Sequence, residues 1–466
     1  MVLMASFIDG YLDRSKHIEV FTDGTVGWSG TPKEFNVGKD DQQIVCFDVR
    51  KLHSAGLSRE QKVYDLRFLF KHDGELSRLV QSVAIPSRDS FLDLERRFSA
   101  HTRAISEASM DINNVPLKEL IPDDVRVSYM KARIQAMKEL WSQLSSTQIE
   151  EYEKNVLPVF MDILKIEEAG IRIDEHHVQV QLKRSDLAAH EERFFQNLRQ
   201  NVKSGFIKTK INPVGSKTWR LRVETNAFNC MGIPHGTCRE SVISRFAGGS
   251  IITLDFNAID YRCLVSATNH PRLNDDYKDA RDFHARTCEM IGEPIEMRDV
   301  VKKCTYAIIY GASIETIQQS TKLPWDVLGP IISRMRNGFL PITTFRMQLS
   351  EKAREQGWLT TPDGHRIEID KLDHDGKIVG LYAQTYSSSM FNKALNQVIG
   401  WLKLRNLGAP NASAMSKVIF TVHDEIVLDM HPDELQYADF LASAMEAVTG
   451  FAVKKKVGKN YEEATK

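Results

Sequence analysis

Hydrophobic and polar residues alternate in some stretches of the chain and recur every three or four positions in others, which predicts strands and helices respectively. Within residues 1–125, the short apolar runs HIEVF, QIVCFDV and LVQSVAI predict strands, whereas SFLDLERRFSAHT has the spacing of a helix. We therefore expect a small α/β domain in this part of the chain.

Helical spacing dominates from Asp124 to about Gly170. It runs through YMKARIQAMKELWSQL and VLPVFMDILKIEEAG, and the second stretch ends at a glycine, as helices often do. A charged, amphipathic stretch at residues 175–204 predicts one long helix or a helical hairpin. This region is expected to connect two larger parts of the chain.

Strand-like runs return after residue 212, in SIITLDF and in VIFTVHDEIVLDM. Between them, a long block with helical spacing extends from about Asp282 to Gln356. Helices inserted between strands predict an α+β fold for the C-terminal part of the chain.

The composition of the 466 residues is 42% hydrophobic and 26% charged, which is typical of a globular protein with two or three domains. The chain has no apolar run of membrane-spanning length and no signal-like start, so we expect an intracellular protein. Its six cysteines form no CxxC pair, which favours reduced thiols over disulfides or a zinc site. A net charge of -1 means that any site for a polyanion must come from local clusters.

Three polar residues, His423, Asp424 and Glu425, interrupt the apolar run VIFTVHDEIVLDM. Alternation along a strand would put His423 and Glu425 on one face and Asp424 on the other. Taken alone, the triplet is explained better by a strand end that turns into a loop, because short motifs often occur by chance. However, the apolar run SIITL leads directly into another aspartate, Asp255, and two such carboxylates can hold Mg²⁺ with positions open for phosphates. Paired metals stabilise the attacking and leaving oxygens of a phosphoryl displacement, so nucleotidyl transfer is a candidate.

The segment RDVVKKCTYAIIY places two cations and two aromatic residues at steps of four. Because four residues advance a helix by about 400°, Arg298, Lys302, Tyr306 and Tyr310 form one stripe. The cations would suit the phosphates of a nucleoside triphosphate, and the rings its sugar or base. The simpler alternative is an amphipathic helix with a solvated charged end. Upstream, His284 offers a further phosphate donor.

Together these segments resemble the polymerase motifs of family A DNA polymerases, the bacterial DNA polymerase I group. Asp255 with Asp260 is similar to motif A, the Arg298 helix to the nucleotide-binding helix of the fingers, and Val422 to Glu425 to motif C. The resemblance implies an α+β right-hand fold of palm, fingers and a short thumb, preceded by a small α/β exonuclease-like domain. The expected domains are a degenerate exonuclease-like domain at 1–145, a connecting helix and short thumb at 146–210, and a palm at 211–466 with fingers inserted at about 268–372.

The resemblance also implies the activity and its partners. The expected protein is a template-directed DNA polymerase that adds dNTPs to the 3′ end of a primer with two Mg²⁺ ions, for which Mn²⁺ can substitute. The implied site residues are Asp255, Asp424 and Glu425 for catalysis; Asp255, Asp424 and the backbone carbonyl of Phe256 for the metals; His284, Arg298, Lys302, Tyr306, Tyr310 and Asp260 for the nucleotide; and Arg222, Asn229, Gln384 and His423 for the primer-template DNA.

Some positions depart from the family pattern. Asp260 stands where the family usually has glutamate, so a ribose 2′-hydroxyl is expected to be excluded less well. Gly380 replaces the usual asparagine four positions before Gln384, so part of the family's primer contacts is expected to be missing. The thumb is short, which suggests a weaker grip on the duplex or a processivity partner.

The N-terminal part lacks the DxE pair of a 3′–5′ exonuclease. FTDGTVGW offers only Asp23, and Arg133 stands where an aspartate would follow Tyr129. We expect an inactive exonuclease-like domain without proofreading, with a partner protein as a possible source of that activity; an unrelated domain is the alternative.

Two other functions fit parts of the pattern. A single-subunit RNA polymerase shares the palm and a similar cationic helix but typically has HDS rather than HDE. A noncatalytic DNA-binding clamp or scaffold derived from a polymerase would not need all four of Asp255, Asp424, Arg298 and Lys302. The expected location is a bacterial or phage-infected host cytoplasm, with an organelle also open, and no membrane partner.

Overall fold

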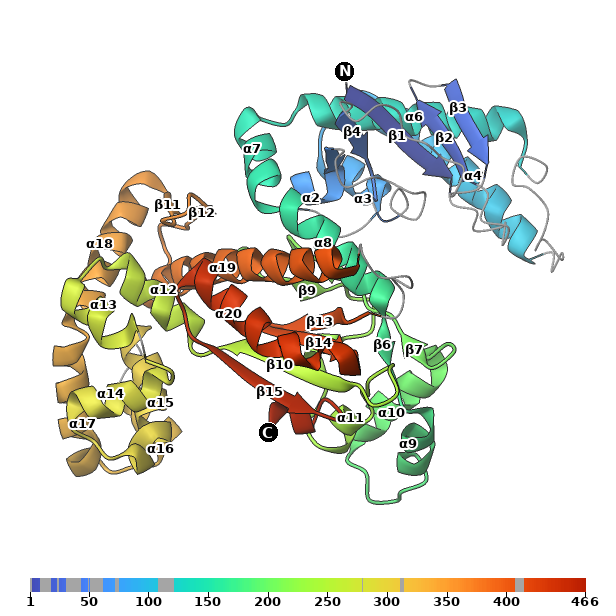
Figure 1. Ribbon diagram of the computed structural model, residues 1–466. Coiled ribbons are helices and arrows are strands. Elements are labelled where there is room, and N and C mark those ends of the chain that lie inside the picture. Colours follow the sequence, from blue (N-terminus) through green and yellow to red (C-terminus); the bar gives the residue numbers. More distant parts are fainter. Residues whose placement is uncertain are drawn as a thin grey trace. The chain divides into compact units, whose positions relative to one another are not determined.

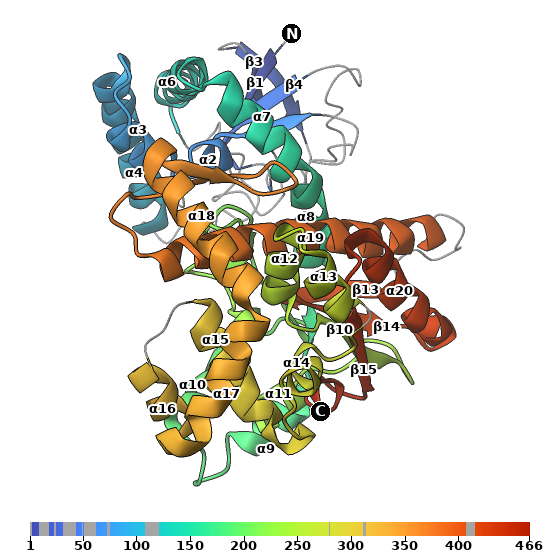
Figure 2. The same ribbon diagram turned by 90° about the vertical axis from the view of Figure 1, so that its left-hand side faces the viewer.

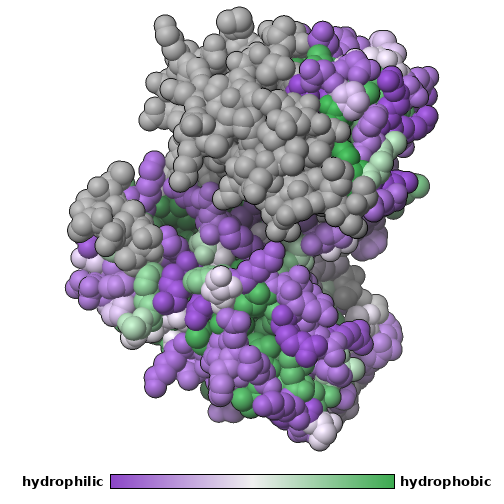
Figure 3. All heavy atoms as spheres, turned by 90° about the vertical axis from the view of Figure 1, so that its right-hand side faces the viewer, coloured by the Kyte–Doolittle hydropathy of each residue, from purple (hydrophilic) through white to green (hydrophobic). Residues whose placement is uncertain are grey.

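The computed structural model describes residues 2–8, 18–22, 25–30, 43–48, 50, 62–71, 75–107, 121–278, 280–310, 314–406 and 415–466. Chain contacts divide it into two compact units, Met1–Leu164 and Lys165–Lys466. Each unit is described by itself, and Figures 1 and 2 show the elements of both. No helix among these residues is long and apolar enough to span a membrane. On the face in Figure 3, hydrophilic and hydrophobic side chains are interspersed.

The first unit contains a mixed five-stranded sheet in the order β3-β2-β1-β4-β5. Strands β1, β2 and β3 are antiparallel, whereas β4 runs parallel to both β1 and β5. The strands of this sheet are β1 (Val2–Ile8), β2 (Ile18–Thr22), β3 (Thr25–Gly30), β4 (Gln43–Cys46) and β5 (Val63–Asp65). The helices are α2 (Leu66–Leu69), α3 (Leu76–Ser82), α4 (Arg88–Glu107), α6 (Asp123–Ser142) and α7 (Ser146–Asn155), and α8 (Leu157–Ala169) crosses the boundary between the units.

Most of the elements expected in this unit are confirmed, but the strand predicted for LVQSVAI is wrong. That stretch begins within helix α3, where Leu76, Leu79 and Val80 are buried. Their spacing of three and four puts them on one helical face, which outweighs the strand preference of valine and isoleucine. Asp23 lies outside the described residues.

The second unit begins with small antiparallel ribbons and two helices. Residues 175–204 form two separate helices rather than one long helix, which confirms the hairpin alternative. The elements are β6 (Ile171–Arg172), α9 (Glu175–Gln181), α10 (Ala189–Asn201), β7 (Phe206–Ile207), β8 (Ile211–Asn212), β9 (Arg222–Val223) and α11 (Thr237–Glu240).

The centre of the second unit is a four-stranded antiparallel sheet in the order β13-β14-β10-β15. Buried residues of β10, β13 and β14, among them Ile251, Phe420 and Val427, join a hydrophobic core. Helices α19 and α20 lie alongside this sheet (Figure 1). The elements are β10 (Ser250–Phe256), α19 (Asp375–Asn406), β13 (Lys417–Val422), β14 (Glu425–Met430), α20 (Ala438–Thr449) and β15 (Val453–Gly458).

A mainly helical region is inserted between β10 and α19, and its buried residues share one core. Figure 2 shows helices α14 to α17 grouped together beneath α12 and α13. The predicted helical block from Asp282 to Gln356 is confirmed as several helices. The elements are α12 (Ile259–Ala267), α13 (Pro271–Lys278), α14 (Phe283–Ile291), α15 (Arg298–Ile309), α16 (Ile314–Thr321), α17 (Trp325–Gly338), α18 (Leu340–Gln356), β11 (Trp358–Thr360) and β12 (Arg366–Glu368). The six cysteines are buried and free, as expected from their spacing.

Candidate active site

The polar triplet lies at the tip of a β-hairpin. Strand β13 ends at Val422, β14 begins at Glu425, and these two residues pair with each other. His423 and Asp424 therefore form the turn, and His423 adopts a left-handed backbone conformation with φ of 55°. The prediction that alternation sends Asp424 to the opposite face of a continuous strand is wrong, because the apolar flanks pair with one another and leave a two-residue turn.

The hairpin tip lies beside the end of β10. Strand β10 pairs with β14 so that Asp255 is directly opposite Glu425. The backbone N–H of Phe256 donates to the backbone carbonyl of Asp424, with an N···O distance of 3.3 Å. The structure thus brings together Asp255 and Asp424, which are far apart in the chain.

Negative charges accumulate at this edge of the sheet. Burial, and then the neighbouring carboxylates of Asp424 and Glu425, raise the pKa of Asp255 to about 7. Burial and the Asp260 carboxylate raise the pKa of Asp424 to about 6. The raised pKa values mean that the surrounding protein provides too few positive charges and hydrogen-bond donors to balance two ionised carboxylates here.

Glu425 differs from the two aspartates because it has a hydroxyl partner. The Tyr461 hydroxyl donates to its Oε1 at 2.9 Å, and the guanidinium of Arg239 lies 4.7 Å from the centre of the Tyr461 ring. Burial raises the pKa of Glu425, and the hydrogen bond from Tyr461 opposes that effect. Glu425 is thereby fixed in orientation at the side of the aspartate pair.

The donor set fits a hard divalent cation, because carboxylate oxygens are the ligands that Mg²⁺ prefers and the charge here is uncompensated. Among the described residues, no group of three or more His, Cys, Asp or Glu side chains is arranged to hold a metal ion. A cation bound by Asp255 and Asp424 would therefore take its remaining ligands from backbone, water or substrate.

The cationic end of helix α15 meets helix α14. The Arg298 guanidinium contacts Asp282, the N-cap residue of α14, with an Nη2···Oδ2 distance of 2.7 Å. His284 is 3% exposed, and burial, together with the charges of Arg298 and Lys302, lowers its pKa to about 4. His284 is thus a neutral hydrogen-bonding group near neutral pH. Lys302 is exposed to solvent.

The aromatic end of the same helix continues toward the carboxylates. Tyr306 is 41% exposed, and its ring contacts that of Tyr261 with a centroid distance of 4.7 Å. Burial raises the pKa of Tyr306, and the charges of Asp260 and Asp424 add to the effect. Tyr310 ends the helix as its C-cap residue, and burial and then Asp260 raise its pKa. The predicted stripe therefore exists and has its aromatic end near the acidic residues.

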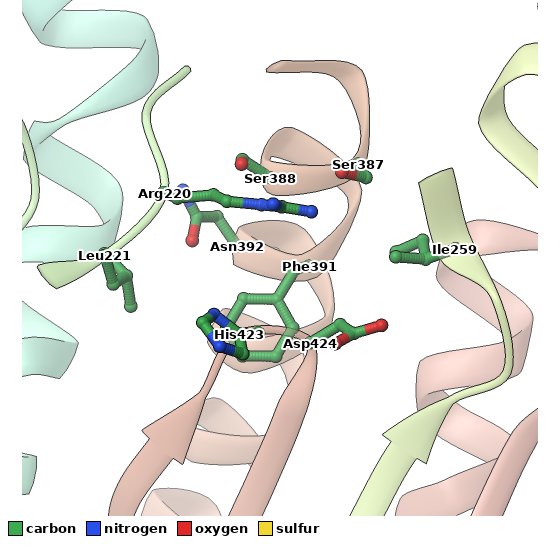
Figure 4. Close-up of a pocket in the computed structure, with 9 residues that line it drawn as sticks. All are labelled: Arg220, Leu221, Ile259, Ser387, Ser388, Phe391, Asn392, His423 and Asp424. Carbon is green, nitrogen blue, oxygen red and sulfur yellow. The ribbon is translucent and has the colours of Figure 1, made fainter. Parts of the chain in front are cut away.

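Asp260 is held by residues that the sequence did not single out. Arg220 Nη2 donates to its two carboxylate oxygens at 2.8 and 3.0 Å, and Ser387 Oγ donates to Oδ1 at 2.5 Å. Figure 4 shows a hollow in which Arg220 extends above His423, with Asp424 close by and Ser387 on helix α19. The sequence could have indicated Ser387 through its position three residues after Gln384, because this spacing puts both residues on one face of a helix.

The predicted primer-template residues do not all lie together. His423 is exposed and lines the hollow of Figure 4, whereas Arg222 and Asn229 are exposed and are not among its lining residues. Gln384 is half-buried on α19, and its backbone carbonyl accepts a hydrogen bond from Ser388. Arg220, two positions before Arg222, is the cation that lies at the acidic residues.

A fold of this kind is known among nucleic-acid enzymes. The structure superimposes on the POL domain of Pol1 from M. smegmatis, determined in complex with DNA primer-template and dNTP, with a TM-score of 0.70. The superposition covers 100% of this chain and 96% of that chain, at 14% sequence identity. The fold is therefore that of a polymerase domain.

The sequence comparison is more specific. The model of DNA polymerase family A matches residues 165–463, which is more than half of the chain, and the chain belongs to this family. It is 25% identical over 269 residues to the thermostable DNA polymerase I of Thermus thermophilus, covering 54% of this chain and 31% of that protein. It is 20% identical over 168 residues to the DNA polymerase of Mycobacterium phage D29, covering 35% of this chain and 28% of that protein. The matched stretches thus span less than a third of each relative.

Proposed function

We propose that this protein is a template-directed DNA polymerase that adds dNTPs to the 3′ end of a primer. The observation that carries the proposal is the meeting of Asp255 and Asp424 at one edge of the sheet. Membership of DNA polymerase family A supports it over a single-subunit RNA polymerase. Retention of both aspartates together with Arg298 and Lys302 supports catalysis over a noncatalytic clamp.

The nucleotide would lie along helix α15. Arg298, Lys302 and the neutral His284 would hold its phosphates, and their charges and N–H groups would position the reacting phosphorus without covalent chemistry. Tyr306 and Tyr310 would meet the sugar and the base pair. Arg222, Asn229, Gln384 and His423 remain the proposed contacts to primer-template DNA, and Arg220 joins them because it lines the same hollow as His423.

Asp255 and Asp424 would hold the metals, with the Phe256 backbone carbonyl as a further ligand. Bound Mg²⁺ or Mn²⁺ would supply charge neutralisation for the attacking and leaving oxygens. The chain itself contributes a fixed pair of carboxylates on a rigid sheet and a tyrosine-bonded Glu425 that supports them. This preorganisation lets the charged groups act without rearrangement during the reaction.

The test is the Asp424→Asn variant in a primer-extension assay with Mg²⁺. Losing one carboxylate should reduce extension about a thousandfold, since metal stabilisation of the transition state contributes several kcal/mol. Primer-template affinity, measured separately by fluorescence anisotropy, should stay close to that of the parent protein.

The matched control is Asp433→Asn, which makes the same chemical change at an 88% exposed side chain. This control should extend primers normally. Normal extension by Asp424→Asn would instead overturn the two-metal assignment.

We also propose that the N-terminal unit is exonuclease-like but lacks proofreading. Arg133 donates to the Tyr129 hydroxyl at 3.1 Å and lies over its ring, so a cation occupies the position expected for a metal-binding aspartate. A partner protein would then supply proofreading, or processivity in view of the short α9–α10 region. The expected setting is the cytoplasm of a bacterium or of a phage-infected host, or an organelle.

A further inference from the structure

The carboxylate of Asp260 accepts hydrogen bonds from two other parts of the fold. Its Oδ1 accepts from both Arg220 and Ser387, and its Oδ2 accepts from Arg220. Ser387 is 2% exposed and projects from α19, the helix that follows the inserted helical region. Two elements therefore determine how this carboxylate is oriented.

If the nucleotide lies along α15 as in the proposed function, its sugar would lie at Asp260. A reacting phosphate at Asp255 and Asp424, with the remaining phosphates at Arg298, leaves the sugar near the aromatic end of α15. Charges of Asp260 and Asp424 both act on Tyr306 there. A ribose 2′-hydroxyl would then meet Asp260.

An ionised carboxylate is an acceptor with about four lone-pair positions, so a free one would accept a hydrogen bond from a 2′-hydroxyl. A carboxylate oxygen that already accepts two hydrogen bonds, as Oδ1 of Asp260 does, is a poor acceptor for that hydroxyl. The carboxylate then acts mainly as a steric barrier. A 2′-hydroxyl that approaches it loses its hydrogen bonds to water without gaining an equivalent partner.

We propose that Ser387 is a positioning residue for sugar selection: by occupying and orienting Asp260, it makes the shorter acidic side chain exclude ribonucleotides. The role of Ser387 differs from that of the two serines that follow it. Ser388 donates to the Gln384 carbonyl within the helix, and Ser389 bonds Asp363. Ser387 also lies 3.1 Å from the Gln384 carbonyl, but its contact with Asp260, at 2.5 Å, is the shorter one. Ser387 is the member of this row that reaches Asp260.

The experiment compares kcat/KM for a dNTP and for the rNTP of the same base in single-nucleotide primer extension. Ser387→Ala should lower the dNTP-to-rNTP ratio about tenfold, the effect expected from one hydrogen bond to a charged group. The change should come from faster rNTP incorporation, which a poorly folded fraction of the variant cannot produce. Ser387→Thr keeps the hydroxyl and should restore most of the ratio.

Two further variants locate the effect. Thr385→Val removes a buried hydroxyl of the same helix that donates to the Leu381 carbonyl at 2.8 Å, and it should keep the parental ratio. In an Asp260→Ala background, Ser387→Ala should change the ratio no further, because the two residues act as one unit.

The outcomes separate this inference from the proposed function. If the parent extends primers with dNTPs and Ser387→Ala keeps its ratio, the role of Ser387 is refuted and the polymerase proposal stands. The role of Ser387 would also be refuted if Ser387→Ala lowered the ratio equally in the parent and in the Asp260→Ala background, since Ser387 would then act through another residue. A parent that extends no primer overturns both.

Discussion

At the scale of single residues, the acidic pair combines proximity with burial. Asp255 and Asp424 lie at adjacent points of a hairpin tip and a strand end, and Lys454 is directly opposite Asp255 on its other side. The charges of Lys454 and Lys456 lower the pKa of Asp255, but burial and the other carboxylates outweigh them. Without a bound cation, the ionised aspartates therefore make the folded protein less stable than uncharged side chains at the same positions would.

This imbalance predicts how stability depends on pH. The pKa of Asp255 is about 7 in the folded protein against an ordinary value of 3.8, so the folded state binds the proton more tightly. Stability contributed by this group falls as pH rises from about 4 to 7. Asp255→Asn should raise the melting temperature in EDTA at pH 8.5, by about 2–4 °C per kcal/mol recovered, and by less at pH 5.5.

Asp282→Asn is the control with the opposite sign. Burial alone would raise the pKa of Asp282, but the hydrogen bond and charge of Arg298, together with the backbone N–H groups of Ala285 and His284, outweigh burial and lower it. Its charge therefore stabilises the fold throughout pH 5.5–8.5, and the variant should melt lower at both values. An equal shift for Asp255→Asn at the two pH values would contradict the assigned pKa.

At the scale of elements, the start of α19 and the end of α15 approach closely at a glycine. A Cβ added to Gly376 would lie 1.9 Å from the Tyr310 carbonyl oxygen, and the Tyr310 ring lies against Gly380. Only a residue without a side chain allows this approach. At Gly380, by contrast, a Cβ would meet the Tyr310 ring at 3.5 Å, which is an ordinary van der Waals distance.

Gly376→Ala should push Tyr310 out of place. Overpacking of this kind typically costs about 1–3 kcal/mol, and we expect a lower melting temperature and a lower kcat/KM for dNTP. Gly400→Ala is the matched control, because it changes the same helix at a position where a Cβ meets nothing within 4 Å. The control should be neutral or slightly stabilising. Equal behaviour of the two variants would show that the contact with Tyr310 does not constrain function.

At the scale of the whole molecule, the two units differ in their chemistry. In the first unit, Arg67 Nη2 contacts both Asp48 and Asp65, at 2.9 and 2.8 Å, at the ends of the parallel strands β4 and β5. In the first unit a guanidinium thus neutralises both carboxylates, whereas in the second unit burial and neighbouring carboxylates raise the pKa of Asp255 and of Asp424. This contrast agrees with our proposal that the carboxylates of the second unit carry the catalysis.

The resulting prediction concerns proofreading. A labelled primer with a mismatched 3′ end, incubated with Mg²⁺ and no dNTP, should keep its length. The assay should use the Asp424→Asn variant as well as the parent, so that reversal of the polymerase reaction is separated from hydrolysis. Shortened primer that persists in this variant would show an active nuclease, and a proofreading polymerase serves as the positive control.

Much of this protein could be predicted from local sequence. Helical spacing identified α4, α6 and α8, and the motif residues identified the family, because periodicity and motif spacing are properties of neighbouring positions. The same local pattern failed for LVQSVAI and for the HDE triplet. In LVQSVAI, burial of one face favours the helix α3 over a strand. In the HDE triplet, the pairing of Val422 with Glu425 leaves His423 and Asp424 in a turn.

The sequence by itself determined which residues carry charge and which elements carry them: Asp255 near the end of a strand, Arg298 at the start of a helix, and Asp424 between apolar flanks. Only the tertiary structure decided what surrounds those charges. Pairing of β10 with β14 places the aspartates together, and the approach of α19 brings Ser387 to Asp260. Such contacts depend on packing between segments distant in the chain, and no spacing rule along one segment encodes them.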